Sequence, residues 1–313
     1  MTAPVSPSPA GTRSLRRARP HYGEAGIKAL LFLAALVSVG TTVGIVVALI
    51  PPTADFFQRV GVWEFLSGTE WTALFSDPEY GVLPLLTATV LITVIALIVA
   101  IPIGLGAAVY LSEYASRRTR GIFKPILEIL AGIPTVVYGF FAFAFITPLL
   151  QDHWPFGDPP EVKNALSAGL VMGVMIVPTI ASLSEDAMSA VPHSLRDGAY
   201  ALGSGKRTVS VRVVMPAALS GIVAAFVLGV SRALGETMIV LIAAGAKPDL
   251  TLNPLHEMQT MTAFIAGAAS GDVSTASFEY KTIFAVGALL FLLTFVMNVI
   301  SIRLVRKYRE VYE

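Results

Sequence analysis

The sequence predicts an all-α membrane protein that crosses the bilayer six times. Of its 313 residues, 55% are hydrophobic and only 14% are charged, whereas soluble domains carry about 25% charged residues. About 20 apolar residues span a bilayer. Long apolar runs of this kind occupy residues 27–50, 82–110, 123–150, 165–184, 221–245 and 282–304. The net charge of +1 indicates no particular partner. The absence of cysteine excludes disulfides and thiolate metal sites.

The residues before the first run form an arm of different composition. Residues 1–26 are rich in Pro, Ser, Ala and Arg, which cannot bury a core, so we expect a disordered cytoplasmic arm. A signal peptide is the alternative, but the run 27–50 is too long and no small-residue cleavage site follows it. Residues 27–81 are therefore expected to form an uncleaved first spanning helix and an external loop.

The second and third runs are interrupted by proline. Pro84 and Pro102 lie in one, and Pro134 and Pro148 in the other. Proline is tolerated in membrane helices where neighbouring groups satisfy the freed backbone. Kinks or breaks are expected at these positions.

The distribution of basic residues fixes the orientation. Lys and Arg gather in the N-terminal arm, after the second and fourth runs, and in the tail 305–313. The other three loops are acidic and carry only Arg59, Lys163, Lys247 and Lys281. Basic loops stay in the cytoplasm, so both termini, including the tail, are predicted to be cytoplasmic in a multi-pass membrane protein.

Two charged residues lie inside the fifth run. Arg232 and Glu236 are four residues apart, which would place them on one face of a continuous helix. A charge at the bilayer centre costs roughly 2.5–3.5 kcal/mol, so such residues are functional candidates by default. The structural alternative is an intrahelical pair that only neutralises itself. Functionally, the planar guanidinium of Arg232 matches an oxyanion, and Glu236 would hold it in position and limit the affinity.

The connection 191–218 is long and helix-forming. Its pattern predicts a short helix, a turn at Gly203, a second short helix, and Pro216 opening the fifth span. Small residues in it allow close approach of another protein. A basic loop held by lipid headgroups is the alternative.

This connection resembles the Glu-Ala-Ala coupling motif of ABC importer permeases, with Asp for Glu, Gly for the first Ala, Val for Ile and Met for Leu. The motif positions that match in spacing are Asp197, Gly198, Ala199, Gly203, Val213, Met215 and Pro216. Residues 130–139, containing Gly-Ile-Pro-Thr-Val-Val-Tyr-Gly, and residues 231–238, Ser-Arg-Ala-Leu-Gly-Glu-Thr-Met, resemble two signatures of the phosphate-specific permeases. Met-Ile-Val after Gly-Glu-Thr is more similar to the PstC type than to its PstA-type sister.

The resemblance implies a type I, MetI-like permease domain over residues 82–304 that forms half of a heterodimeric phosphate pore. It implies a PstA-type second permease, two PstB-type ATPase subunits that bind the ATP and magnesium, and an external PstS-type phosphate-binding protein. The loop 191–218 would dock on the ATPase. Arg232 and Glu236 would line the phosphate pathway, to which Thr135, Tyr138 and Thr237 could add neutral donors; interhelical hydrogen bonding is the alternative for these three. Gly132, Gly139 and Gly235 are expected to serve close helix packing.

Other site classes are excluded by the residues themselves. Residues 203–208 resemble a phosphate-binding loop, but Tyr200 stands where its first Gly is needed. The four His residues are scattered, so no metal site, no catalytic set and no cofactor bound by this chain is expected, nor is a nucleic-acid partner. Membrane lipid is expected to surround the spanning helices. The remaining alternatives are a permease for molybdate or sulfate, and an ATP-independent secondary transporter.

Overall fold

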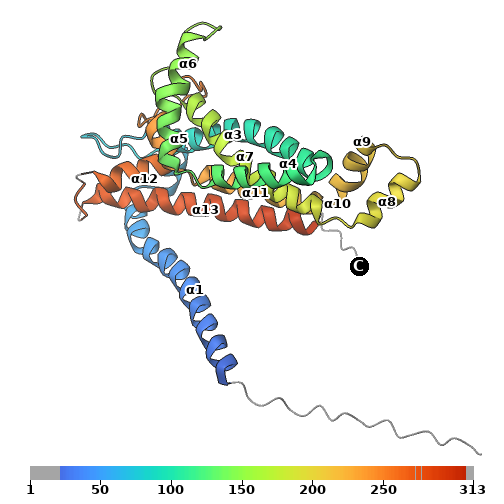
Figure 1. Ribbon diagram of the computed structural model, residues 1–313. Coiled ribbons are helices and arrows are strands. Elements are labelled where there is room, and N and C mark those ends of the chain that lie inside the picture. Colours follow the sequence, from blue (N-terminus) through green and yellow to red (C-terminus); the bar gives the residue numbers. More distant parts are fainter. Residues whose placement is uncertain (1–21, 272, 276, 308–313) are drawn as a thin grey trace, which may run out of the picture. The chain divides into compact units, whose positions relative to one another are not determined.

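The computed structural model describes residues 22–271, 273–275 and 277–307, and within these ranges it is all-helical, as predicted (Figure 1). One isolated β-bridge joins Trp71 and Tyr80. The expected N-terminal arm, for residues 1–21, and the end of the tail, 308–313, lie outside the described residues. The chain divides into two compact units, residues 1–50 and 51–313.

The first unit consists, where described, of most of helix α1 (Tyr22–Phe57). The helix begins at Tyr22 rather than at Ile27. Its apolar side chains between Ile27 and Ile50 are exposed, as befits a helix that contacts hydrocarbon. The last turns of α1, which contain Pro51 and Pro52, belong to the second unit.

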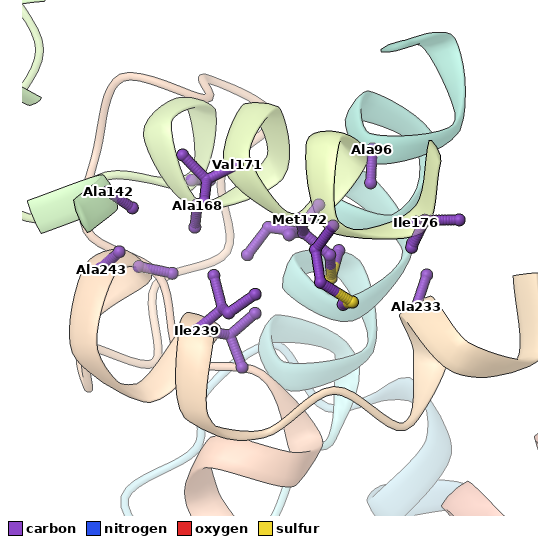
Figure 2. Close-up of a cluster of buried hydrophobic side chains, with 14 of the residues drawn as sticks. Ala96, Ala142, Ala168, Val171, Met172, Ile176, Ala233, Ile239 and Ala243 are labelled. Atoms are coloured by element: carbon purple, nitrogen blue, oxygen red, sulfur yellow. The ribbon is translucent and has the colours of Figure 1, made fainter. Parts of the chain in front are cut away.

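Helices α3 (Leu83–Val109) and α7 (Ala165–Ser189) form the centre of the second unit and correspond to the second and fourth runs. Glycines allow their close approach: a Cβ on Gly169 would lie 2.7 Å from Ile95 Cγ2, and one on Gly173 would lie 2.8 Å from the Ala96 carbonyl. Small residues of this kind drive helix association in membranes. The core between α7, α11 and η4 contains Met172, Ile176 and Ile239 (Figure 2).

The third run is broken at Pro134, as expected. Its part before the break is α4 (Arg117–Ala131), an amphipathic helix that buries no residue and packs beside α7. After the break come α5 (Thr135–Phe141), the π-helical turn η2 (Ala142–Ile146) and α6 (Thr147–Asp152). Pro148 lies in the first turn of α6, where proline is tolerated. Pro84 likewise lies in the first turn of α3. Pro102 lies inside α3, and the helix continues through it.

The fifth run differs from the prediction. Helix α11 (Leu219–Leu234) ends eleven residues before Gly245, and a π-helical turn, η4 (Val240–Ala244), follows the interruption. Residues 206–217 and α11 are bent by 71° at Ala218. In the described part of the chain five helices could cross a membrane, and six if this bent pair is one span.

Three further helices belong to the second unit. They are α2 (Val62–Ser67), α12 (Met261–Ser270) and α13 (Phe278–Lys307), the last matching the sixth run. Helix α13 packs beside α11 and α12. An aromatic cluster joins these parts: the Trp71 ring lies 4.9 Å from that of Phe264, and the Phe56 ring stacks on Phe278 at 5.6 Å. The short π-helical turn η1 (Tyr110–Tyr114) extends α3 at its C-terminal end.

Candidate functional site: a broken helix and a coupling segment

Arg232 lies in the last turn of α11 and points to α7. Its Nη1 donates a hydrogen bond to the Thr179 hydroxyl at 3.1 Å. Gly229, one turn earlier, brings the two helices together, because a Cβ there would lie 3.2 Å from side-chain atoms of Ile176 and Ile180. The guanidinium is half-buried. Its position is therefore set by a neighbouring helix and not by its own.

The backbone between α11 and η4 is non-helical at Glu236 and Thr237. The Glu236 carboxylate compensates for this, since its Oε1 accepts hydrogen bonds from the backbone N–H of Met238 at 3.0 Å and of Ile239 at 3.2 Å. The Glu236 carbonyl accepts one from the Thr262 hydroxyl at 2.6 Å. Irregular backbone at membrane depth requires such internal partners. Glu236 is 8% exposed.

The expected side-by-side pair of Arg232 and Glu236 is thus wrong for this conformation. The helix ends at Leu234, so the rule that places residues four apart on one face does not apply. The described contacts of Arg232 include Thr179 and no carboxylate. Its positive charge remains available to an anion, and Glu236 has a backbone role that the sequence analysis did not foresee.

The signature at residues 130–139 packs directly on this break. A Cβ on Gly139 of α5 would lie 3.1 Å from the Met238 carbonyl and 3.3 Å from Ile239 Cα, closer than most side chains approach their neighbours, so glycine allows this contact without displacing them. The neighbouring Tyr138 hydroxyl donates to the Leu130 carbonyl at 3.0 Å, across the break between α4 and α5. Arg232 lies within electrostatic range of that hydroxyl. Two sequence stretches about a hundred residues apart therefore meet at one site.

The other expected pathway residues, Thr237 and Thr135, lie in the break and in α5. Thr237 donates a weak hydrogen bond to the Gly235 carbonyl at 3.4 Å. Thr135 begins α5 and is half-buried. Gly139 fulfils the expected packing role, but Gly132 and Gly235 do not: their nearest neighbours are carbonyls of their own preceding turns. Both lie at helix ends, where they allow the chain to turn.

The coupling segment, residues 191–218, has the expected order of a helix, a turn and a second helix. Helix α8 (His193–Ala201) is followed by Gly203 with φ +80°, a value that favours glycine. The second helix consists of α9 (Lys206–Val209), the π-helical turn η3 (Ser210–Val214) and α10 (Met215–Ala217). The span itself opens at Leu219, after the bend, and not at Pro216 as expected.

The motif positions separate into two groups. Half-buried Ala199, Val213 and Met215 pack on a core of Val191, Val209, Val214 and neighbours, and so hold the segment to the bundle. Exposed positions face outward. These are Asp197, Gly198, Gly203 and Pro216, together with Tyr200 and Leu202, which are 42% and 89% exposed and were not foreseen.

A buried carboxylate ties α4 to α7. Glu185 forms ion pairs with Arg120 and with Lys124 Nζ, the latter at 2.8 Å, and its side chain is 1% exposed. The sequence analysis ended the fourth run at Ser184 and therefore missed it. The pairing lets a charged residue remain inside α7, because each buried charge has a partner.

Glu161, at the opposite end of α7 from Glu185, joins two loops. Its carboxylate accepts a hydrogen bond from the Glu257 backbone N–H at 2.7 Å and lies 2.9 Å from His256 Nδ1. These contacts with His256 and Glu257 lower the pKa of Glu161 below its usual range. No cluster of three or more metal-ligating side chains occurs in the described part of the chain.

Comparison with known sequences shows the family to which the chain belongs. A family model described as "Binding-protein-dependent transport system inner membrane component" matches residues 100–310. The PstC phosphate transport system permease protein of Xylella fastidiosa (strain 9a5c) is 33% identical, with 97% of each chain covered. PstC 1 of Mycobacterium tuberculosis (strain H37Rv) is 36% identical over 73% of each. The probable ABC transporter permease YqgH of Bacillus subtilis is 33% identical over 88% of this chain and 89% of its own.

Solved structures show a similar fold at low sequence identity. A chain of the inward-facing MetNI methionine ABC transporter superposes with a TM-score of 0.53 at 18% identity, covering 74% of this chain and 95% of that one. A chain of a bacterial alginate ABC transporter gives a TM-score of 0.62 at 12% identity, covering 92% and 98%.

Proposed function

The chain belongs to the family of binding-protein-dependent transport system inner membrane components, and we propose that it forms half of the phosphate pathway of an ATP-driven importer. It is a multi-pass ABC permease subunit and not an enzyme. Its relatives are PstC-type phosphate permeases over most of their length. The observation that carries the anion assignment is Arg232, half-buried at a helix break and bonded to a neutral hydroxyl rather than a carboxylate.

The chemistry of this site suits phosphate. Arginine stays charged at any relevant pH and presents donors that match phosphate oxygens. Because Arg232 has a hydroxyl partner, a passing anion would not have to displace a carboxylate. The single fixed charge favours transient binding, and a conduit must release what it binds. Tyr138, Thr135 and Thr237 would supply neutral donors.

The partners follow from the same proposal. A PstA-type permease would complete the pore, an external PstS-type protein would deliver phosphate, and two PstB-type ATPase subunits would bind ATP and magnesium. The exposed face of α8, with Asp197, Tyr200 and Leu202, is the proposed ATPase contact. Both termini would be cytoplasmic in a prokaryotic inner membrane.

The test is ATP hydrolysis by the reconstituted four-component assembly with the binding protein loaded with phosphate, sulfate or molybdate. We expect phosphate alone to stimulate hydrolysis and uptake. Stimulation by sulfate or molybdate instead would assign another oxyanion. Uptake without the ATPase subunits would replace the proposal by a secondary transporter.

A further inference from the structure

A single buried arginine joins the coupling segment to two spanning helices. Arg196, in the second turn of α8, donates from Nη1 to the Val191 carbonyl at 2.6 Å and from Nη2 to the Met188 carbonyl at 2.8 Å. The same Nη2 bonds Glu113 Oε1 at 3.0 Å. The side chains of Arg196 and Glu113 are 11% and 4% exposed. The other basic residues of the segment, Lys206, Arg207 and Arg212, are exposed.

These contacts connect three elements. Met188 lies in the last turn of α7 and Val191 just beyond its end, where the carbonyls at a helix C-terminus favour a cation. Glu113 lies in η1, at the cytoplasmic end of the α3 span. Helix α8 itself buries no residue completely. Arg196 is therefore the polar joint through which α8 is fixed to α3 and α7 together.

Helix α7 leads from this joint to the anion site. Thr179, which positions Arg232, precedes Met188 by nine residues, or about 14 Å along the helix. Glycine contacts pack α3 and α7 tightly; a Cβ on Gly104 would lie 2.8 Å from Ile180 Cγ2. A displacement of α8 would accordingly move α3 and α7 as one body, and with them the hydroxyl that holds Arg232.

We propose that Arg196 and Glu113 are positioning residues that transmit the movement of the coupling segment to the α3–α7 pair. The inference rests on the proposed function, because that function assigns the movement to an ATPase bound at α8. The contact of Arg196 with α3 and α7 does not depend on which anion is carried. Breaking it should uncouple α8 from α7 while leaving the exposed face of α8 able to bind an ATPase.

The chain contains no cysteine, so it can be labelled at introduced cysteines before assembly with its partners. Spin labels at Ser194→Cys on α8 and Val174→Cys on α7, both exposed positions, give one distance in the assembled complex with and without trapped nucleotide. We expect a narrow distribution of distances between the two labels, and the same distribution with and without nucleotide. Arg196→Gln should broaden the distribution of distances between the labels or make it depend on nucleotide, and Glu113→Gln should have the same effect to a smaller extent. Arg196→Lys, which keeps the charge, should give a distribution of intermediate width. An unchanged narrow distribution in Arg196→Gln overturns the proposal.

A transport assay distinguishes positioning from a general loss of stability. At equal amounts of assembled complex, Arg196→Gln should lower phosphate transported per ATP hydrolysed by roughly fivefold or more, with Arg118→Gln, which removes an exposed cytoplasmic charge of α4, as the matched control. Reduced assembly with an unchanged ratio would mean a merely structural role and overturn the proposal. If the unaltered complex fails to move phosphate, the proposed function fails, whereas the distance measurement still decides the joint.

Discussion

The Arg232 guanidinium bonds the Thr179 hydroxyl of a neighbouring helix at 3.1 Å, although Glu236 follows it by only four residues. The helix that would have paired Arg232 with Glu236 ends between them. A cation held by a neutral partner keeps its charge for a ligand, while the carboxylate maintains the break. This division of roles underlies the predictions below.

Removing the hydroxyl that holds Arg232 should impair transport. Thr179→Val keeps the shape of the side chain but offers no acceptor to the guanidinium. A hydrogen bond to a charged group contributes about 1.5–3 kcal/mol, so phosphate uptake should fall by about tenfold or more at equal membrane abundance. Thr179→Ser should retain most activity. Thr294→Val removes a hydroxyl that bonds only its own helix and serves as the control; equal losses in both variants would contradict the role of Thr179.

Glu236 should be more sensitive to loss of its oxygen than to loss of its charge. Glu236→Gln keeps an acceptor for the backbone N–H groups of Met238 and Ile239, whereas Glu236→Ala leaves both without it. Loss of a comparable helix cap costs about 0.5–2 kcal/mol. Thermal unfolding of the purified protein should therefore show the alanine variant as clearly less stable than the glutamine variant. Equal destabilisation by both would indicate that charge neutralisation is the main role.

The close approach of α5 to the helix break should not tolerate a larger residue. Gly139→Ala places a Cβ 3.0 Å from Ile242 Cδ1 and 3.1 Å from the Met238 carbonyl, and overpacking of this kind costs typically about 1–3 kcal/mol. Gly106→Ala is the matched control, since nothing lies within 4 Å of a Cβ there. Thermal stability should fall for the first variant and hold or rise for the second. A larger loss of stability in Gly106→Ala than in Gly139→Ala would contradict the close packing of residues 130–139 on the helix break.

The two loops that Glu161 joins should loosen in acid. The pKa of Glu161 is lowered from its ordinary 4.5 because His256 and the Glu257 backbone N–H favour the ionised carboxylate. The ionised Glu161 carboxylate therefore stabilises the loops fully when the pH is above its ordinary pKa. This stabilisation is lost as the pH falls through the lowered pKa of the folded state. Spin labels at the exposed Val162 and Leu252 should move apart over this range. Glu161→Gln should be loose at all pH values, and Glu70→Gln, an exposed external control, should behave as the unaltered chain does.

Local patterns were sufficient for the spans and the coupling segment. The apolar runs define most helices, and Gly203, the one residue of the segment with a positive φ, marks its turn. The interruption after Leu234 was not predictable, because Gly-Glu-Thr inside an apolar run is also compatible with a helix. It is stabilised by a hydrogen bond from Thr262, which is distant in the sequence. Thr179 and Glu113 were missed for the same reason: their partners, Arg232 and Arg196, lie in other helices.

The most direct test of the account is phosphate uptake by the reconstituted assembly carrying Arg232→Leu, compared at equal membrane abundance with Arg118→Leu. The first change removes the charge at the helix break, and the second removes an exposed charge of α4. We expect uptake to be abolished or nearly so in the first and retained in the second. Normal uptake by the Arg232→Leu assembly would contradict the claim that this guanidinium receives the anion.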